Sequence, residues 1–447
     1  MKKSKEIIAE DRMLISNSSR ISYFPLVVQE GRGAIIKDID GKTYIDLLSS
    51  AAVNNTGHAH PKIVEAITRQ AKSFIHYTPV YMYHEPLVRL AKQLVSLTPG
   101  KFSKRVRFGL SGSDANDAVI KFARAYTNRQ KIVSFFRSYH GSTYGALSLS
   151  AISLNMRRKM GPFLPEIYHI PFPDCYRCPF GRNYPSCNGI CWEQIENIYF
   201  KTILPPEEVA AIVVDPILGD AEIIIPPPFF LPELRKFCTE HGILLVDEEI
   251  QMGFGRTGKW FAIEHWDVIP DIVVMGKAIA SGMPLSALVA RADILEALEP
   301  PADLFSCAAN PIACVASLAT IEVIREEKLV EQSAKLGKHT INRLLEMKDH
   351  HQLIGDVRGK GLSIGVDLVK DYQSKKRAVK EALKVCWQCY EKGVLIIAFS
   401  GSVLRIQPPL VITQQELDHA LAIIDESLTE VEDGRVPDKV LERMTGW

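Results

Sequence analysis

The sequence has no long hydrophobic run and no excess of charge of either sign. No stretch reaches the roughly 20 apolar residues that a membrane-spanning helix needs, and the N-terminal segment has lysines without the apolar core of a signal peptide. Its 53 basic residues are matched by 52 acidic ones and are spread along the chain, which argues against a nucleic-acid-binding surface. We therefore expect a soluble cytoplasmic protein with neither a membrane nor nucleic acid as its partner.

The chain also lacks internal repeats and the disulfide pattern of a small secreted protein. Nine cysteines, an odd number in a chain of 447 residues, favour reduced thiols. Four of them gather in a segment rich in Pro, Gly and Tyr: Cys175, Cys178, Cys187 and Cys191. They could bind structural zinc, form two disulfides or stay reduced, and the spacing leaves these alternatives open. No metal is assigned to the active site.

A nucleophile elbow of the GxSxG type is absent as well. Its absence argues against a serine hydrolase built on His58, His60 or His140, although histidines of that kind can serve in a catalytic triad.

What the sequence does contain is an alternation of short apolar runs with helical patterns between about residues 64 and 325. The runs are continuously apolar, as expected of strands buried on both faces; they cover residues 105–110, 131–136, 211–215, 243–247, 271–275 and 285–290. The alternation predicts an α/β fold whose large domain, residues 64–325, has a mostly parallel sheet between helices. Residues 1–63 and 326–447, with a hairpin around Asp40-Gly41, predict a smaller, discontinuous α+β domain.

A tight turn at residues 111–113 joins the strand 105–110 to a helical stripe that begins near Asp114. Free backbone N–H groups and the positive end of a helix dipole suit a phosphate group, so Gly112 and Ser113 are candidate phosphate-binding residues. The simpler alternative is that Ser113 only caps the helix. The GxGxxG pattern at residues 253–258 is not a dinucleotide site, because acidic residues precede it and no clear helix follows it.

Lys277 follows the strand 271–275 directly, after Gly276. The carboxyl ends of parallel strands are where α/β sheets bind ligands, and an amine at this place could attack an aldehyde. Taken alone, a solvated loop lysine is the simpler interpretation.

Several separate motifs together resemble the class III aminotransferase family, in the right order and over nearly the whole chain: Ser111–Asp117, Tyr139–Thr143, Asp247–Gly258, Gly276-Lys277, Asn310-Pro311 and Arg405. The resemblance implies a pyridoxal 5'-phosphate (PLP) enzyme of fold type I. It implies a homodimer, or a dimer of dimers, with the active site at the subunit interface. It also implies that Lys277 holds PLP as the internal aldimine.

The same resemblance implies roles for other cofactor-binding residues. Gly112 and Ser113 would hold the phosphate, and Ser306 would reach the phosphate of the neighbouring subunit. Tyr139 would stack on the pyridine ring, with His140 supporting it, and Gln251 would be a further cofactor-binding residue.

The family places an acid on the pyridine nitrogen three residues before a glutamine. Counting back from Gln251 gives Glu248, with Asp247 as the alternative. Successive strand residues point to opposite faces, so only one of the two can lie under the ring unless the strand bulges. Either carboxylate would keep the ring nitrogen protonated and make the cofactor an electron sink.

The resemblance gives Arg405 the role of binding the substrate's α-carboxylate through two parallel hydrogen bonds. Lys277, once released, can act as general base at Cα. Asp220 stands where many family aminotransferases have a glutamate that pairs with this arginine. For Asp220, the shorter acid, two interpretations stay open: a second proton donor, or a simple ion-pair partner of Arg405.

Within the family, the chain most resembles amino-acid racemases of the isoleucine 2-epimerase type. The likeness is carried by residues 113–126, 141–144, 155–160, 280–287, 405–412 and 446–447. We therefore expect a racemase or 2-epimerase that acts at Cα of a free amino acid through an external aldimine. The alternative is an aminotransferase of the 4-aminobutyrate or ornithine type.

Overall fold

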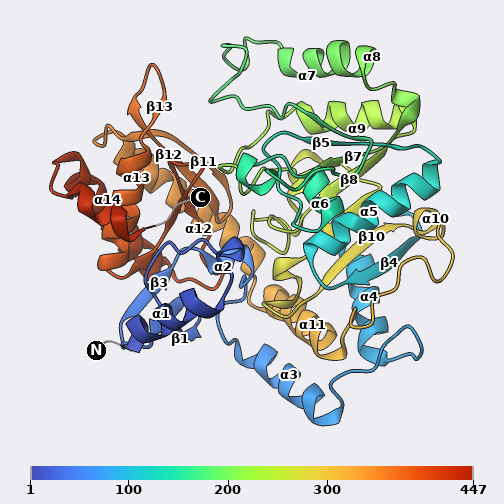
Figure 1. Cartoon of the computed structure of the whole chain (residues 1–447), viewed down its shortest axis with the longest axis horizontal. Coiled ribbons are helices and arrows are strands. Elements are labelled where there is room, and N and C mark those ends of the chain that lie inside the picture. Colours follow the sequence, from blue (N-terminus) through green and yellow to red (C-terminus); the bar gives the residue numbers. More distant parts are fainter. Residues whose placement is uncertain (1–2, 445–447) are drawn as a thin grey trace. The chain divides into compact units, whose positions relative to one another are not determined.

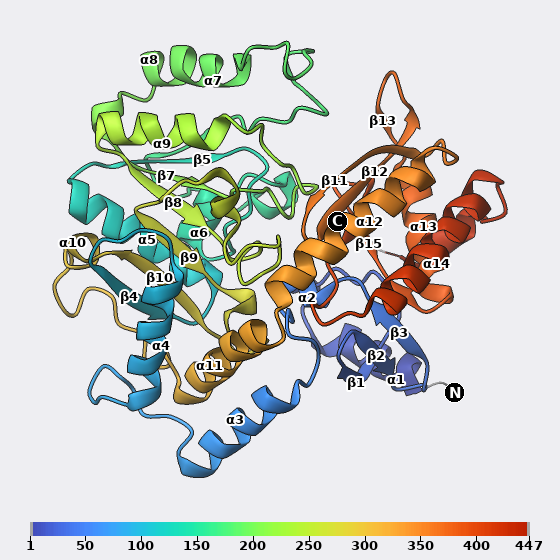
Figure 2. The ribbon, with the colours of Figure 1, turned by 180° about the vertical axis from the view of Figure 1, so that it is seen from behind.

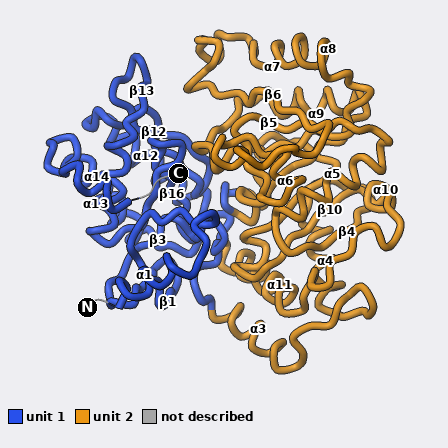
Figure 3. The backbone as a smooth tube through the Cα atoms, in the orientation of Figure 1, with its two compact units in different colours: residues 1–60, 256–258, 329–447 blue, residues 61–255, 259–328 orange. Residues whose placement is uncertain are grey.

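The computed structural model describes residues 3–444, so residues 446–447 of the racemase resemblance lie outside it. The chain forms two compact units (Figure 3): residues 1–60, 256–258 and 329–447, and residues 61–255 and 259–328. The domain bounds expected from the sequence, 64–325 against the two chain ends, stay a prediction. Within residues 3–444, no helix combines the length and the hydropathy needed to cross a bilayer.

The unit of residues 61–255 and 259–328 is built around a seven-stranded sheet in the order β4-β10-β9-β8-β7-β5-β6. Only β10 runs antiparallel to its neighbours. The strands are β4 (Lys104–Gly109), β5 (Lys131–Phe135), β6 (Ile167–Ile170), β7 (Val209–Val214), β8 (Leu244–Glu248), β9 (Ile272–Met275) and β10 (Ser286–Arg291). The predicted mostly parallel sheet is confirmed, and β6 is a strand that the sequence analysis missed.

Burial explains why these strands are continuously apolar. Every residue of β7 is buried, because helices cover both faces of a parallel sheet. Helix α5 (Gly112–Thr127) packs Ala118, Val119 and Phe122 into one core cluster with residues of the sheet, among them Val213. The other helices of this unit are α3 (Pro61–Ser73), α4 (Glu85–Leu97), α6 (Tyr144–Leu149), α7 (Ile190–Gln194), α8 (Phe200–Thr202), α9 (Phe230–His241), α10 (Ala292–Leu295) and α11 (Pro311–Glu326) (Figure 1).

The second unit holds two smaller sheets (Figure 2). One has the order β1-β2-β3-β14, and the other has the order β11-β12-β16-β15 with β13 beside β12. The predicted hairpin around Asp40-Gly41 is the antiparallel pair β2 and β3. The strands are β1 (Val28–Arg32), β2 (Ile35–Asp38), β3 (Thr43–Asp46), β11 (Ile354–Lys360), β12 (Ser363–Asp371), β13 (Lys376–Arg377), β14 (Val394–Leu395), β15 (Ile397–Phe399) and β16 (Val403–Ile406). The helices are α1 (Lys3–Leu14), α2 (Ser49–Ala52), α12 (Leu329–Lys348), α13 (Val379–Glu391) and α14 (Gln414–Glu432).

Candidate active site

A cavity of about 170 Å³ lies at the carboxyl ends of the parallel strands β4, β5, β7, β8 and β9. Ligands bind at this edge of α/β sheets, because the loops that follow the strands converge there. The lining residues are Gly112, Ser113, Arg137, Ser138, Tyr139, His140, Gly141, Asp215, Leu218, Gly219, Asp220, Glu248, Ile250, Gln251 and Lys277. The structure therefore brings together most of the site residues expected from the sequence.

Helix α5 begins at the cavity wall. Its N-cap is Ser111, whose hydroxyl accepts a hydrogen bond from the Asp114 N–H, while the Asp114 carboxylate accepts one from the Ser111 N–H. The alternative in which Ser113 caps the helix is therefore wrong. Ser113 lies in the first turn, where its Oγ accepts a hydrogen bond from the Ser142 N–H at 3.1 Å. Since the first N–H groups of a helix have no partner within it, this turn suits an anion.

Two glycines let the backbone pack closely around this turn. A Cβ on Gly112 would lie 2.6 Å from Cδ1 of Ile250. Gly141 has a φ of +138°, and a Cβ there would lie 2.7 Å from Cβ of Ser113. Tyr139, on the loop before Gly141, is half-buried and lines the cavity.

Two acids and one histidine meet at the buried end of the cavity. One ligand atom each of His140, Asp215 and Glu248 lies within 4.8 Å of the others. Asn116 on α5 connects them, since its Nδ2 donates to the His140 carbonyl at 2.7 Å and lies 3.4 Å from Oε1 of Glu248. Asp215 was not among the site residues expected from the sequence. Its position directly after the fully buried strand β7, at the edge where ligands bind, was the available signal.

Burial controls the charge of this group. It raises the pKa of Glu248 to about 7 and the pKa of Asp215 well above its ordinary value, with the neighbouring acid adding to the effect on Asp215. Burial also lowers the pKa of His140 to about 3, so its ring is neutral. Among residues 3–444, neither ring nitrogen of His140 nor Oδ2 of Asp215 has a hydrogen-bond partner. Buried polar groups of this kind fit a ligand that brings a proton and a positive charge.

The two acids expected at the pyridine nitrogen are separated by the alternation of β8. Glu248 is on the cavity wall, and Asp247 is not among the lining residues. Asp247 is fully buried on the other face of the strand, and neither of its carboxylate oxygens has a hydrogen-bond partner within the described part of the chain.

Lys277 enters the cavity from the end of β9. It opens the short helix Lys277–Ala280 with a φ of +43°, a conformation that costs a residue other than glycine on the order of 1 kcal/mol. Its Nζ lies 4.0 Å from Oδ2 of Asp220. The other oxygen of Asp220, Oδ1, accepts a hydrogen bond from Nε2 of Gln251 at 3.0 Å. A side chain on Gly219 would overlap the Gln251 amide, so this arrangement requires glycine there.

Besides Asp247, two more of the expected site residues do not line the cavity. Ser306 is exposed, and its carbonyl accepts a hydrogen bond from Nε2 of His76 at 2.9 Å. Arg405 lies in the other unit, on β16, where it is buried and its guanidinium stacks 3.8 Å from the centre of the Phe399 ring. Their roles stay predictions.

The cavity residues fit PLP by their chemistry. The first turn of α5 suits the phosphate, the half-buried Tyr139 offers an aromatic face, and Lys277 offers an amine. The buried acids Asp215 and Glu248 suit a protonated ring nitrogen, because a positive charge favours their ionised forms.

Comparisons with known proteins agree with this chemistry. The class-III aminotransferase family matches residues 16–428. The chain is 46% identical to the isoleucine 2-epimerase of Lentilactobacillus buchneri, over 100% of this chain and 99% of that protein. It is also 46% identical to the leucine/methionine racemase of Thermococcus litoralis, over 100% of both chains. The crystal structure of an aminotransferase from Bacillus anthracis superposes with a TM-score of 0.89 at 30% identity, covering 96% of this chain and 99% of that one. The chain thus belongs to the class-III aminotransferase family, whose members are PLP-dependent enzymes of fold type I.

Proposed function

We propose that this protein is an amino-acid racemase or 2-epimerase that inverts Cα of a free, apolar amino acid. The observation that carries the proposal is the pair formed by Lys277 and Asp220, whose amine and carboxylate lie 4.0 Å apart in the cavity. Inversion requires removal of a proton from one face of Cα and its return to the other, so it needs two groups that can hold a proton. The similarity to the epimerase and the racemase supports the same reaction.

Several residues would hold the cofactor. Lys277 would bind it through its amine, and Gly112 and Ser113 would bind its phosphate at the start of α5. Glu248 would face the ring nitrogen, with Asn116 donating a hydrogen bond to its carboxylate and Asp215 beside it. When bound, PLP withdraws electrons from Cα and so makes the Cα proton acidic.

The proton transfers are then carried out by side chains of this protein. Once the substrate amine has taken its place on the cofactor, the released amine of Lys277 takes the proton from Cα on one face. Its flexible stem lets the amine move away from Asp220 to make room for the substrate. Asp220 gives a proton to the other face. The hydrogen bond from Gln251 leaves Oδ2 of Asp220 toward the cavity, which orients this oxygen for the transfer.

Other parts of the proposal concern groups outside the cavity. Arg405 binds the α-carboxylate of the substrate, and Ser306 binds the phosphate in the neighbouring subunit of a homodimer. The similarity to an isoleucine 2-epimerase and a leucine/methionine racemase supports a preference for an apolar side chain.

The proposed reaction is tested by incubating the purified enzyme with PLP and one L-amino acid, without any 2-oxo acid. Chiral chromatography should detect D-leucine from L-leucine and D-allo-isoleucine from L-isoleucine. If apolar and basic amino acids give no inverted product, and amino-group transfer appears only after addition of a 2-oxo acid, the enzyme is an aminotransferase and the proposal is wrong.

A further inference from the structure

Four cysteines line a second cavity, which lies in the same unit as the active site. Its volume is about 20 Å³, close to the smallest space that holds a single water molecule or an ion of similar size. Its wall includes Cys175, Cys178, Cys187 and Cys191. None of the nine cysteines is in a disulfide.

The segment that carries these cysteines has little regular structure of its own. Between β6 and α7 the backbone forms turns, which are closed by short-range hydrogen bonds such as Gly181 N–H to Cys178 O and Cys187 N–H to Asn183 O. Asn188 and Gly189 have positive φ angles of 50° and 74° and reverse the chain between the last two cysteines. This connection runs from residue 171 to residue 189 without a helix or strand, which is uncommon in a compact domain and usually indicates a function.

We propose that Cys175, Cys178, Cys187 and Cys191 bind one structural Zn²⁺ ion. The two pairs, with two and three residues between their members, have the spacing of cysteine ligands on tight turns. Four thiolates are a ligand set typical of closed structural zinc sites, and soft sulfur ligands exclude Mg²⁺ and Ca²⁺. The ion would link Cys175 and Cys178, near the start of the segment, to Cys187 and Cys191 near its end. The turns themselves join only residues that are close in sequence.

Binding requires a modest rearrangement of the side chains. Among the described residues, no three of the four Sγ atoms lie within 4.8 Å of one another, whereas Zn–S bonds of about 2.3 Å place the sulfur atoms roughly 3.8 Å apart. Cys175 is exposed and the other three are half-buried, so the side chains have room to rotate. Burial and the neighbouring thiols raise the pKa of Cys175 to about 11, and a bound Zn²⁺ reverses this effect by displacing the protons.

The cysteine segment is connected to the active-site cavity. Asp174, next to Cys175, accepts hydrogen bonds from the Arg177 N–H and from Nη1 of Arg137, both at 2.9 Å. Arg137 lines the active-site cavity and also pairs with Glu222 at 2.7 Å. The zinc ion therefore holds a segment that helps to position a residue of the active-site wall.

The test is the zinc content of the untagged full-length protein, purified without chelator, dialysed against ZnCl2 and then against metal-free buffer. Inductively coupled plasma mass spectrometry should find one zinc per chain in the wild type. Cys175→Ser and Cys187→Ser should each lower the content to less than a fifth of that value. Cys307→Ser is the matched control, because Cys307 is an exposed cysteine outside the cluster and its loss should leave the zinc in place.

Two results would overturn the proposal. One is wild-type protein without stoichiometric zinc after this treatment. The other is a thiol titration in denaturant that finds five thiols instead of nine, because two disulfides would then occupy the cluster. If the serine variants do not fold, cobalt exchange into the wild type decides, since four thiolates around Co²⁺ give strong sulfur-to-metal charge-transfer bands and an empty cluster gives none.

Discussion

Nε2 of Gln251 donates a 3.0 Å hydrogen bond to Oδ1 of Asp220, while Oδ2 of the same carboxylate lies 4.0 Å from Nζ of Lys277. Gln251 thus orients one of the two groups that we propose to move the proton. One hydrogen bond to a charged acceptor is worth about 1.5 kcal/mol, which corresponds to roughly a tenfold rate effect. We expect Gln251→Leu to lower kcat for inversion by about tenfold.

The same variant should leave KM and the absorption spectrum of the bound cofactor nearly unchanged, because Gln251 acts through Asp220. Steady-state kinetics with chiral detection separate the two parameters. A large rise in KM, or loss of the cofactor band, would mean that Gln251 binds substrate or cofactor directly.

Glu248 and Asp247 differ in the face of β8 that they occupy, and this gives a paired experiment. Glu248→Gln should weaken retention of PLP by about 100-fold, since removing one partner of a buried ion pair costs on the order of 3 kcal/mol. Asp247→Asn should keep the cofactor, because Asp247 is outside the cavity lining. Equilibrium dialysis and the visible spectrum measure both variants, and the reverse order of effects would contradict the assignment.

Some features of this site can be predicted from a single sequence and others cannot. The family resemblance singled out Glu248 through the count back from Gln251. Strand alternation, which is a local property, explains why only one of the two neighbouring acids lines the cavity. Asp215 was missed, since its meeting with His140 depends on the order of β5, β7 and β8 in the sheet. A cap at Ser113 would place the helix start two residues later than observed, whereas α5 begins at Gly112 and is capped by Ser111. A sequence pattern predicts the ends of a helix less well than its presence.

Strand β6 was also not predicted, because its sequence carries only a weak strand signal. Its four residues, Ile167–Ile170, are mostly only half-buried at the edge of the sheet, so they lack the continuous apolar run that marked the central strands. Arg405 and Ser306 were expected from the family resemblance alone, and their roles depend on how separate parts of the protein come together.

An exposed apolar segment fits the proposed homodimer. Residues 74–83 expose Ile75, Tyr81, Met82 and Tyr83, the last with 99% of its surface accessible, and apolar patches of this kind usually mark contact surfaces. We expect the wild type to elute as a dimer or tetramer, and Tyr81→Asp with Tyr83→Asp to shift it toward the monomer. Light scattering after size exclusion measures the mass. A monomeric wild type with full activity would contradict the proposed interface.

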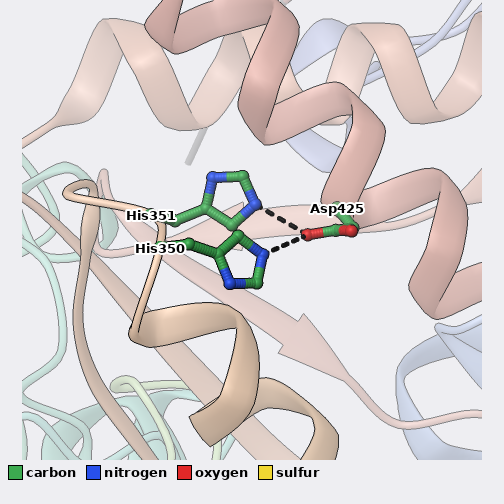
Figure 4. Close-up of side chains that lie close together, drawn as sticks. All are labelled: His350, His351 and Asp425. Carbon is green, nitrogen blue, oxygen red and sulfur yellow. Dashed lines mark hydrogen bonds and ion pairs between the residues drawn. The ribbon is translucent and has the colours of Figure 1, made fainter.

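A cluster of histidines and acids in the unit of residues 1–60, 256–258 and 329–447 predicts that the stability of the protein depends on pH (Figure 4). The two ring nitrogens of the buried His351 lie 2.7 Å from Asp425 and 2.6 Å from Glu432, and His350 lies 3.2 Å from the same Asp425 oxygen. Burial tends to raise the pKa of Asp425, but the hydrogen bonds from His351 and His350 outweigh it, so this pKa lies below its ordinary value.

We expect His351→Ala to lower the free energy of unfolding by about 2 kcal/mol at pH 6. Solvent screening keeps this effect from being larger, because the Asp425 side chain is 44% exposed. A carboxylate whose pKa is lowered by folding stabilises the protein above its unfolded pKa of about 3.9, and this contribution is lost as the pH falls through the folded value. The difference between the wild type and His351→Ala should therefore shrink below about pH 4. Urea unfolding across this range measures it, with His350→Ala as the milder control, and a difference that grows toward acid would contradict the account.

The most direct test of the two-residue account is exchange of the Cα proton in D2O by Asp220→Asn, with the wild type alongside. If Lys277 serves one face and Asp220 the other, the wild type should invert leucine and introduce deuterium at Cα. The variant should still exchange the Cα proton of one enantiomer while forming inverted product at least 100-fold more slowly, in line with the usual contribution of a general acid. Inversion by Asp220→Asn at nearly the wild-type rate would show that Asp220 is not the second group and would contradict the central claim.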